Sequence, residues 1–336
     1  EALSHIQSGS RIFVQGAAAT PNVLLKSLVE ETDLRDCEIM HLHTEGPALY
    51  AEEQHRERFR VTNLFVGHNL RYKVDYDRID YLPCFLSEIP LLLRSGVRSP
   101  DVALLHVSPP DAHGFCSLGV SVDIALAAAQ TAPTLIAQVN PQMPRVLGDG
   151  LLHVDRFTAL VDVNEALPER RMGQTSEICQ KLAHHVAGLV EDGATLQAGI
   201  GAIPDAVMAE LGHLKHLGLH TEMWSDGALS LIKKGVIDNS RKKVHPGKCI
   251  SSFLIGSREL YDFVDDNPSA IQLGIDYVNF PVTIARNPRV TAINSALEVD
   301  LSGQVCADSL GHNIFSGVGG QMDFIRGAQL SEGGKP

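Results

Sequence analysis

Two glutamates stand in the same tetrapeptide, LHTE, at Leu42–Glu45 and at Leu219–Glu222. An ionised side-chain carboxylate can act as a nucleophile that forms a covalent intermediate. Glu222 is followed closely by a Ser-Asp-Gly turn at 225–227, and it shares its half of the chain with two glycine-rich loops. These neighbours favour Glu222 as the reactive residue, whereas the repeat keeps Glu45 as the alternative.

The first glycine-rich loop lies in TLQAGIGAIPDAV, where a predicted strand runs into Gly199 and a predicted helix starts near Pro204. Proline suits a first helical turn, because the N–H that it lacks would be unpaired there. The free N–H groups and the helix dipole favour an anion or a polarised carbonyl at such a turn. The loop is therefore either a ligand-binding loop or a simple strand-to-helix turn. It matches neither the dinucleotide fingerprint nor a Walker A motif.

The second loop, NIFSGVGGQMDF, places Gly317, Gly319 and Gly320 around Val318. Such a run can turn consecutive N–H groups toward one point, as an oxyanion hole requires. A flexible turn before a helix is the alternative interpretation. The residue types alone leave both open.

The bulk composition narrows the classes of ligand. A net charge of −12 argues against nucleic acid, although a local site can still bind a phosphate-bearing small ligand. The length of 336 residues predicts about two domains. No apolar run approaches the ~18–20 residues that span a bilayer. Six scattered cysteines predict reduced thiols in a cytosolic or matrix-like compartment.

Metal and serine chemistry are both disfavoured. Fifteen histidines, among them His213, His216 and His220, include no HExxH pattern, so we predict no metal site. A GxSxG elbow, which would indicate a serine esterase, is absent from the sequence. The basic run at 241–243 either contacts the phosphates of a ligand or lies in a solvated loop.

Three motifs recur in the same order and indicate two halves of one architecture. GAAATPNVLLKSL, from Gly16, aligns with GIGAIPDAVMAEL, from Gly199, at an offset of 183. LHTE follows in both halves. SPPDAHG at 108–114 then aligns with LEVDLSG at 297–303, at an offset of 189.

Aliphatic runs alternate with helical segments in both halves. The predicted buried strands are RIFVQG, DVALLHVS, TLIAQVN, FTALVDV, ATLQAG, YVNFPVTIA and VTAINSALEVDL. The alternation predicts an α/β fold with largely parallel sheets covered by helices. The polar stretch at 166–177 marks the junction, so we predict two similar domains at 1–172 and 173–336.

The motifs GIGAIPDAV, LHTEMWSDG and SGVGGQMDFIRGA resemble the acetyl-CoA hydrolase/transferase family, close to 4-hydroxybutyrate and butyrate–acetate CoA-transferases. SPPDAHGFCSLGVSVD and VNPQMPRVLGD fit the same family, and the resemblance covers nearly the whole chain. It implies the fold of the NagB/RpiA/CoA-transferase class, with the active site between two similar α/β domains. The family continues beyond the final GGKP, so we expect the second domain to be cut short here.

The resemblance also implies roles for individual residues. The glutamyl nucleophile of the family falls on Glu222, and Glu45 is expected to be structural or at the wall of the acyl pocket. The residues expected to bind CoA or to supply oxyanion donors are Gly199, Ile200, Gly201, Ala202, Ile203, Leu297, Gly319 and Gly320. Those expected to line the acyl pocket are Gln138, Asn140 and Met143.

The implied reaction transfers CoA between short-chain carboxylic acids such as 4-hydroxybutyrate or butyrate and acetate, through a glutamyl-CoA thioester and ping-pong kinetics. CoA is then a substrate, and no permanently bound cofactor is expected. An acetyl-CoA hydrolase on the same scaffold and a non-catalytic CoA-binding relative are the alternatives. We further expect a homodimer or higher homo-oligomer in the cytoplasm, or in the mitochondrial matrix of a eukaryote, without nucleic-acid or membrane partners.

Overall fold

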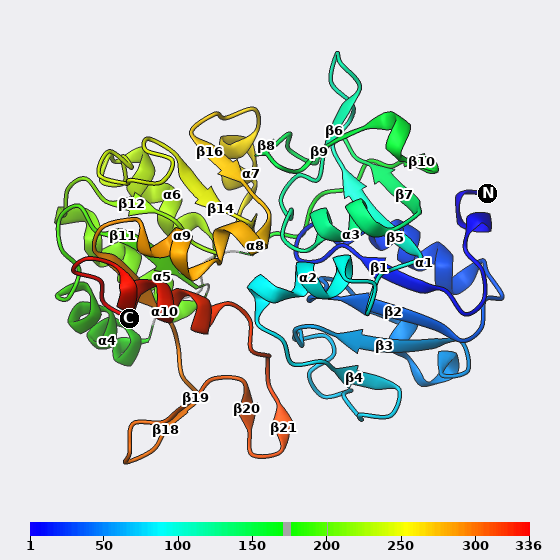
Figure 1. The fold of residues 1–336 in the computed structure, drawn as a ribbon, viewed down its shortest axis with the longest axis horizontal. Coiled ribbons are helices and arrows are strands. Elements are labelled where there is room, and N and C mark those ends of the chain that lie inside the picture. The colour runs from blue at the N-terminus through cyan, green and yellow to red at the C-terminus, as the bar shows by residue number, and fades with distance from the viewer. Residues whose placement is uncertain (171–175, 200) are drawn as a thin grey trace.

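The computed structural model describes residues 1–170, 176–199 and 201–336. Two α/β bodies lie side by side, one formed by the first part of the chain and one by the second (Figure 1). The predicted domain boundary at 172 and 173 falls outside the described residues and stays a prediction. No helix in the described ranges is long and apolar enough to cross a membrane.

The first body is built on a seven-stranded parallel sheet in the order β10-β7-β5-β1-β2-β3-β4. Its strands are β1 (Arg11–Val14), β2 (Cys37–His41), β3 (Phe59–Asn63), β4 (Ile79–Tyr81), β5 (Val102–Val107), β7 (Thr134–Val139) and β10 (Ala159–Asp162). The helices of this body are α1 (Asn22–Glu30), α2 (Ile89–Arg94) and α3 (Ala125–Thr131). Every residue of β5 is buried, as expected for a parallel strand covered on both faces.

The second body divides its strands among small parallel sheets. Its strands are β11 (Thr195–Ala198), β12 (Gly218–Leu219), β13 (Met223–Trp224), β14 (Cys249–Ser251), β15 (Phe253–Leu254), β16 (Ala270–Gln272) and β17 (Val290–Ile293). Its helices are α4 (Glu177–Ala187), α5 (Ala202–Glu210), α6 (Asp226–Lys233), α7 (Arg258–Val264), α8 (Ile275–Val278), α9 (Pro281–Ala285) and α10 (Gln321–Leu330).

Short hairpins extend both bodies. One arm pairs β6 (Phe115–Ser117) with β9 (Leu151–His153), and a second arm carries β18 (Glu298–Val299), β19 (Val305–Cys306), β20 (Ser309–Leu310) and β21 (Asn313–Ile314). The two arms project at opposite ends of the view in Figure 1. Both hairpin arms begin at the third repeated motif of the sequence.

The internal repeat corresponds to a repeated structural unit. In the first body β1 leads into α1 and pairs in parallel with β2, which ends at the first LHTE. In the second body β11 leads into α5 and pairs in parallel with β12, which runs into the second LHTE. On the other side of β1 and β11 lie β5 and β17, each followed by a hairpin arm. The expected α/β class is confirmed by this architecture.

The two bodies are interlocked rather than merely adjacent. β8 (Leu147–Gly148) comes from the residues assigned to the first domain, yet it pairs with β16 at the edge of the sheet β14-β16-β8. One buried cluster also joins Ala17 and Met143 to Leu229 and Leu254. The main core therefore continues across the boundary between the bodies.

Two strand predictions are wrong. YVNFPVTIA forms the end of α8 and all of α9, because Pro281 occupies the first turn of α9, where a missing N–H costs nothing. In VTAINSALEVDL only Val290–Ile293 joins a parallel sheet, and Glu298–Val299 belongs to an antiparallel hairpin. The aliphatic runs alone could not distinguish these outcomes from a long buried strand.

Candidate active site

A cavity of about 310 Å³ opens between the two bodies. The first body contributes residues that follow β2 and β3, including His43, Glu45 and Phe65. The second contributes Glu222 and Phe253, among others. The cavity is therefore lined by both LHTE motifs, which approach it from different bodies.

Glu222 is fixed in this cavity through both its backbone and its side chain. Its carbonyl accepts hydrogen bonds from the N–H groups of Ser252 at 2.9 Å and Phe253 at 3.2 Å. Its Oε2 accepts one from Asn279 Nδ2 at 2.9 Å. Burial raises the pKa of Glu222 to about 7, with a further contribution from the Asp323 carboxylate, while the Asn279 hydrogen bond opposes the rise. The carboxylate is thus desolvated and basic.

The partner of Glu222 is itself held by a carboxylate. Asn279 Nδ2 also lies 3.4 Å from Asp323 Oδ2, in the first turn of α10. Asp323 accepts hydrogen bonds from Ser87 of the first body, from its Oγ at 2.8 Å and from its N–H at 3.2 Å. Ser87 belongs to a short 3-10 helix, Leu86–Glu88. Hydrogen bonds therefore link four chain segments, among them the one that carries the Glu222 carboxylate.

Gly320, one of the predicted residues, packs directly against this group. A Cβ at this position would lie 1.8 Å from Glu222 Oε2 and 2.1 Å from Asn279 Nδ2. The constraint is space rather than backbone conformation, because the φ of Gly320 is −105°. Glycine is required here so that the turn before α10 can contact the carboxylate.

The cavity includes only part of the predicted CoA-contact set. Gly199 lines it together with Gly320. Ile200 lies outside the described residues. Gly201 precedes α5, and Ala202 and Ile203 begin it. None of these three lines the cavity, and neither do Gly319 and Leu297. Gly319 accepts a hydrogen bond from the N–H of Leu86, and the N–H of Leu297 binds Cys306 in the projecting arm.

The three residues expected to line the acyl pocket lie outside this cavity. Gln138 is fully buried in β7, and its Oε1 accepts from the N–H of Leu24. Asn140 donates to the carbonyl of Glu165, and Met143 packs in the core against Gly119. None of the three is among the residues that line this cavity, and their expected place at the acyl pocket stays a prediction.

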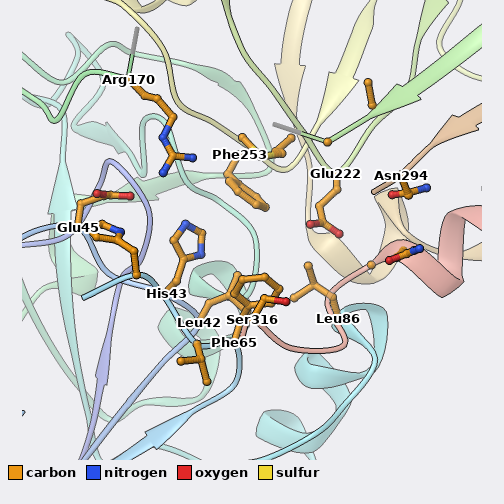
Figure 2. A pocket seen from close by; sticks show the side chains of 18 of the residues that line it. Leu42, His43, Glu45, Phe65, Leu86, Arg170, Glu222, Phe253, Asn294 and Ser316 are labelled. Atoms are coloured by element: carbon orange, nitrogen blue, oxygen red, sulfur yellow. The ribbon is translucent and has the colours of Figure 1, made fainter. Parts of the chain in front are cut away.

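The opposite end of the cavity carries a different group of side chains. Figure 2 shows Glu45 and Arg170 away from Glu222, with His43 and Phe253 in between. The His43 ring lies 5.9 Å from the Phe253 ring, centroid to centroid. Burial lowers the pKa of His43 to about 4, and the Arg170 charge contributes. The two ends are thus separated by an uncharged, largely aromatic segment.

Several residues of this candidate site were missed by sequence reasoning. Asn279 lies in the segment mistaken for a strand, and Ser87 carries no local signal at all. Asp323 follows the second glycine cluster directly. Gln197 and Asn294, at the ends of β11 and β17, line the cavity and exchange two amide hydrogen bonds at 3.0 and 3.2 Å. Asp323 and Gln197 lie within the two glycine-rich motifs, which could have drawn attention to them.

Two of the open sequence features have structural explanations. Lys242 of the basic run is buried, and its Nζ donates to the carbonyls of Leu219 and Lys248 at 2.8 and 2.6 Å. His220 is also buried and donates from Nε2 to the carbonyl of Val278 at 2.8 Å. Within residues 1–170, 176–199 and 201–336, no group of three or more His, Cys, Asp or Glu side chains could hold a metal ion.

The architecture matches solved CoA-transferase-like structures. RipA from Yersinia pestis is 32% identical with a TM-score of 0.93, over 99% of this chain and 78% of that one. The 4-hydroxybutyrate CoA-transferase from Porphyromonas gingivalis is 35% identical with a TM-score of 0.85, over 99% of this chain and 77% of that one. Fold and cavity thus define the CoA-transferase type of α/β protein.

Sequence comparison identifies the family. Residues 1–192 match the acetyl-CoA hydrolase/transferase N-terminal domain, and residues 256–336 match the C-terminal domain. The chain belongs to the acetyl-CoA hydrolase/transferase family. A succinyl-CoA:acetate/propanoyl-CoA:succinate CoA transferase from Fasciola hepatica is 47% identical over the whole chain and 70% of its own length. The 4-hydroxybutyrate coenzyme A transferase from Clostridium kluyveri is 45% identical over the whole chain and 78% of its own length.

These relatives confirm the predicted enzyme class, an acyl-CoA:carboxylate CoA-transferase. Their names cover different acids, so they do not select one substrate for this chain.

Proposed function

We propose that this protein transfers CoA between short-chain carboxylic acids, with Glu222 as the covalent nucleophile. The observation that carries the proposal is the environment of the Glu222 carboxylate. It faces a cavity, accepts a hydrogen bond from Asn279, and has a pKa that burial raises to about 7. A basic, poorly solvated carboxylate is well suited to attack an acyl group, provided that it is ionised.

The proposed reaction balances without a metal or a net proton transfer. The Glu222 carboxylate attacks the thioester carbonyl and displaces the CoA thiolate, which gives an acyl-glutamyl anhydride. The thiolate then attacks the glutamyl carbonyl and releases the first acid, which gives a glutamyl-CoA thioester. A second carboxylate enters, and the same two steps in reverse form its CoA thioester and free Glu222.

Asn279 has a defined part in these steps. When the thiolate attacks the glutamyl carbonyl, negative charge develops on a Glu222 oxygen. The Asn279 amide, already 2.9 Å from Oε2, is placed to donate to that charge. Removal of one comparable donor from an acyl-transfer enzyme costs ~10²–10³ in rate.

The middle of the cavity suits a short aliphatic chain. Phe65, Leu86, Met223 and Phe253 line it between the two polar ends. Such walls favour a small acyl group but discriminate weakly by length, because one methylene is worth only ~1–3 kcal/mol. Candidate donors are therefore the CoA esters of butyrate, 4-hydroxybutyrate and succinate, with acetate as acceptor.

The experiment is acyl-CoA consumption with and without acetate, followed by mass spectrometry of the peptide that contains Glu222. We expect turnover to require acetate, and borohydride to reduce a trapped glutamyl thioester at residue 222. Full activity without acetate would instead identify the hydrolase alternative. The expected homo-oligomeric state belongs to the same proposal, and light scattering after gel filtration tests it.

A further inference from the structure

We propose that Asp323 is a positioning residue, which holds the Asn279 amide with its N–H groups toward Glu222 and is itself held by Ser87 of the other body. The inference rests on the proposed function of Glu222 and extends it to a chain of contacts. Glu222, Asn279, Asp323 and Ser87 are linked by hydrogen bonds of 2.9, 3.4 and 2.8 Å in that order.

The geometry of an amide gives Asp323 this role. The terminal torsion of an asparagine has two roughly equivalent orientations, which exchange the NH₂ group and the oxygen. Between the ionised carboxylates of Glu222 and Asp323, only the NH₂ group can satisfy both acceptors. The carbonyl oxygen of Asn279 has no hydrogen-bond partner within the described part of the chain, so a rotation without Asp323 would let it compete for the place next to Glu222.

The buried position of the Asp323 carboxylate costs free energy, which indicates that the residue has a role. It is 5% exposed, and Asn279 is completely buried. A buried carboxylate costs free energy unless hydrogen bonds compensate, and the compensating donors here are Ser87 and Asn279. Burial raises the pKa of Asp323, and Glu88 contributes to the rise. Besides burial, two negative groups raise the pKa of Glu222, namely Asp323 and the buried Asp123.

The contact with Ser87 connects the site to the interface between the bodies. Ser87 donates to both oxygens of Asp323, while the preceding Leu86 donates its N–H to the carbonyl of Gly319 and lines the cavity. Hydrogen bonds from Leu86 and Ser87 of the first body therefore fix Gly319 and Asp323 at the start of α10. The packing of the two bodies against each other is therefore coupled to the orientation of Asn279.

The test is a double-mutant cycle between Asp323 and Asn279. We expect Asp323→Asn to lower kcat about 10- to 100-fold, with less than a threefold change in KM for acyl-CoA, since it removes part of the donor effect of Asn279. If Asp323 acts through Asn279, the Asp323→Asn/Asn279→Ala variant is no slower than Asn279→Ala alone. Rate losses that simply multiply would overturn the proposal.

A pH profile separates positioning from mere structural support. The Asn279 hydrogen bond lowers the pKa of Glu222 and is a larger cause than the Asp323 charge, which raises it. If Asp323→Asn lets Asn279 rotate away, loss of this hydrogen bond should therefore move the acid limb of kcat/KM to higher pH. Ser87→Ala is the milder variant if Asp323→Asn folds poorly, and it should lower kcat without shifting KM. A limb that is unshifted or moves to lower pH in a folded Asp323→Asn protein contradicts the proposal, because it would mean that Asn279 keeps its orientation without Asp323.

Asp276→Asn is the matched control. Asp276 lies on α8, three residues before Asn279, and like Asp323 it bridges the bodies, through an ion pair with Arg94 at 2.6 Å. Within the described residues its carboxylate forms no hydrogen bond with Asn279 or Glu222. We expect this variant to keep the wild-type kcat and pH limb. If the glutamyl thioester at residue 222 still forms in wild type while the cycle is additive, only the role of Asp323 fails and the proposed function stands.

Discussion

The two LHTE motifs end equivalent strands of the repeat and line one cavity, yet their glutamates have different surroundings. Glu222 meets Asn279 and leaves no room for a Cβ at residue 320. Glu45 lies at the opposite end, close to Arg170 (Figure 2), and its backbone N–H donates to Thr20 Oγ1 at 2.9 Å. The difference comes from later chain segments, because Asn279 after α8 and Gly320 before α10 both lie against the Glu222 carboxylate. We therefore attribute the proposed reactivity of Glu222 to its tertiary neighbours.

The difference between the two glutamates is tested most directly by removing the carboxylates of Glu222 and Glu45 in turn. We expect Glu222→Gln to lower kcat by about 10⁴-fold or more, as is typical for loss of a covalent nucleophile. Glu45→Gln should stay within about tenfold of wild type, with its effect mainly on KM for the acid substrate. The assay is acyl-CoA:acetate exchange, together with mass spectrometry of both peptides. A modified Glu45 peptide would reverse the assignment.

The packing around Glu222 gives the next largest effect. Gly320→Ala places a Cβ against Oε2 and must displace the carboxylate, and a shift of about 1 Å can cost ~10² in rate. Gly212→Ala is the control, because a Cβ there meets nothing within 4 Å. We expect kcat to fall only in the first variant, while circular dichroism shows both folded. Normal turnover of Gly320→Ala would mean that the carboxylate does not react from this position.

The pH dependence should also distinguish the two glutamates. Because burial raises the pKa of Glu222 to about 7, the ionised nucleophile accumulates only as the pH rises through that value. We therefore expect kcat/KM to increase with pH up to about 7 and then to level off. Glu45→Gln should leave this limb unchanged. A limb near pH 4 to 5 would show that the reactive carboxylate is well solvated.

The smallest expected effect is on stability. A folded-state pKa near 7, above the ordinary value of 4.5, means that ionisation of Glu222 lowers the free energy of unfolding as pH rises through this interval. Glu222→Gln should therefore be more stable than wild type at pH 8, by about 1–3 kcal/mol, and equal to it below about pH 4. Urea denaturation at both pH values measures the difference.

The sequence predicted the class of fold. The repeat left both Glu45 and Glu222 as candidates, and only the family resemblance pointed to Glu222, which stays a prediction. The groups that act on Glu222 could not be predicted. Periodicity identifies β1, β5 and β7 because a buried parallel strand is a continuous aliphatic run. It cannot place Asn279 beside Glu222, since the two are brought together by the packing of α8. The same limit applies to Gln138 and Asn140, because polar residues in or beside a strand can belong to the core as well as to a site.

The pairing of β8 with β16 has a consequence for how the repeat can change in evolution. Gly148 lies so close to the backbone of Gln272 that a Cβ would come within 1.9 Å of its carbonyl oxygen. A duplicated unit that lends its partner an edge strand can no longer be exchanged, permuted or expressed as a separate module. The halves have become complementary fragments, and their divergence must now proceed as co-evolution within a single polypeptide.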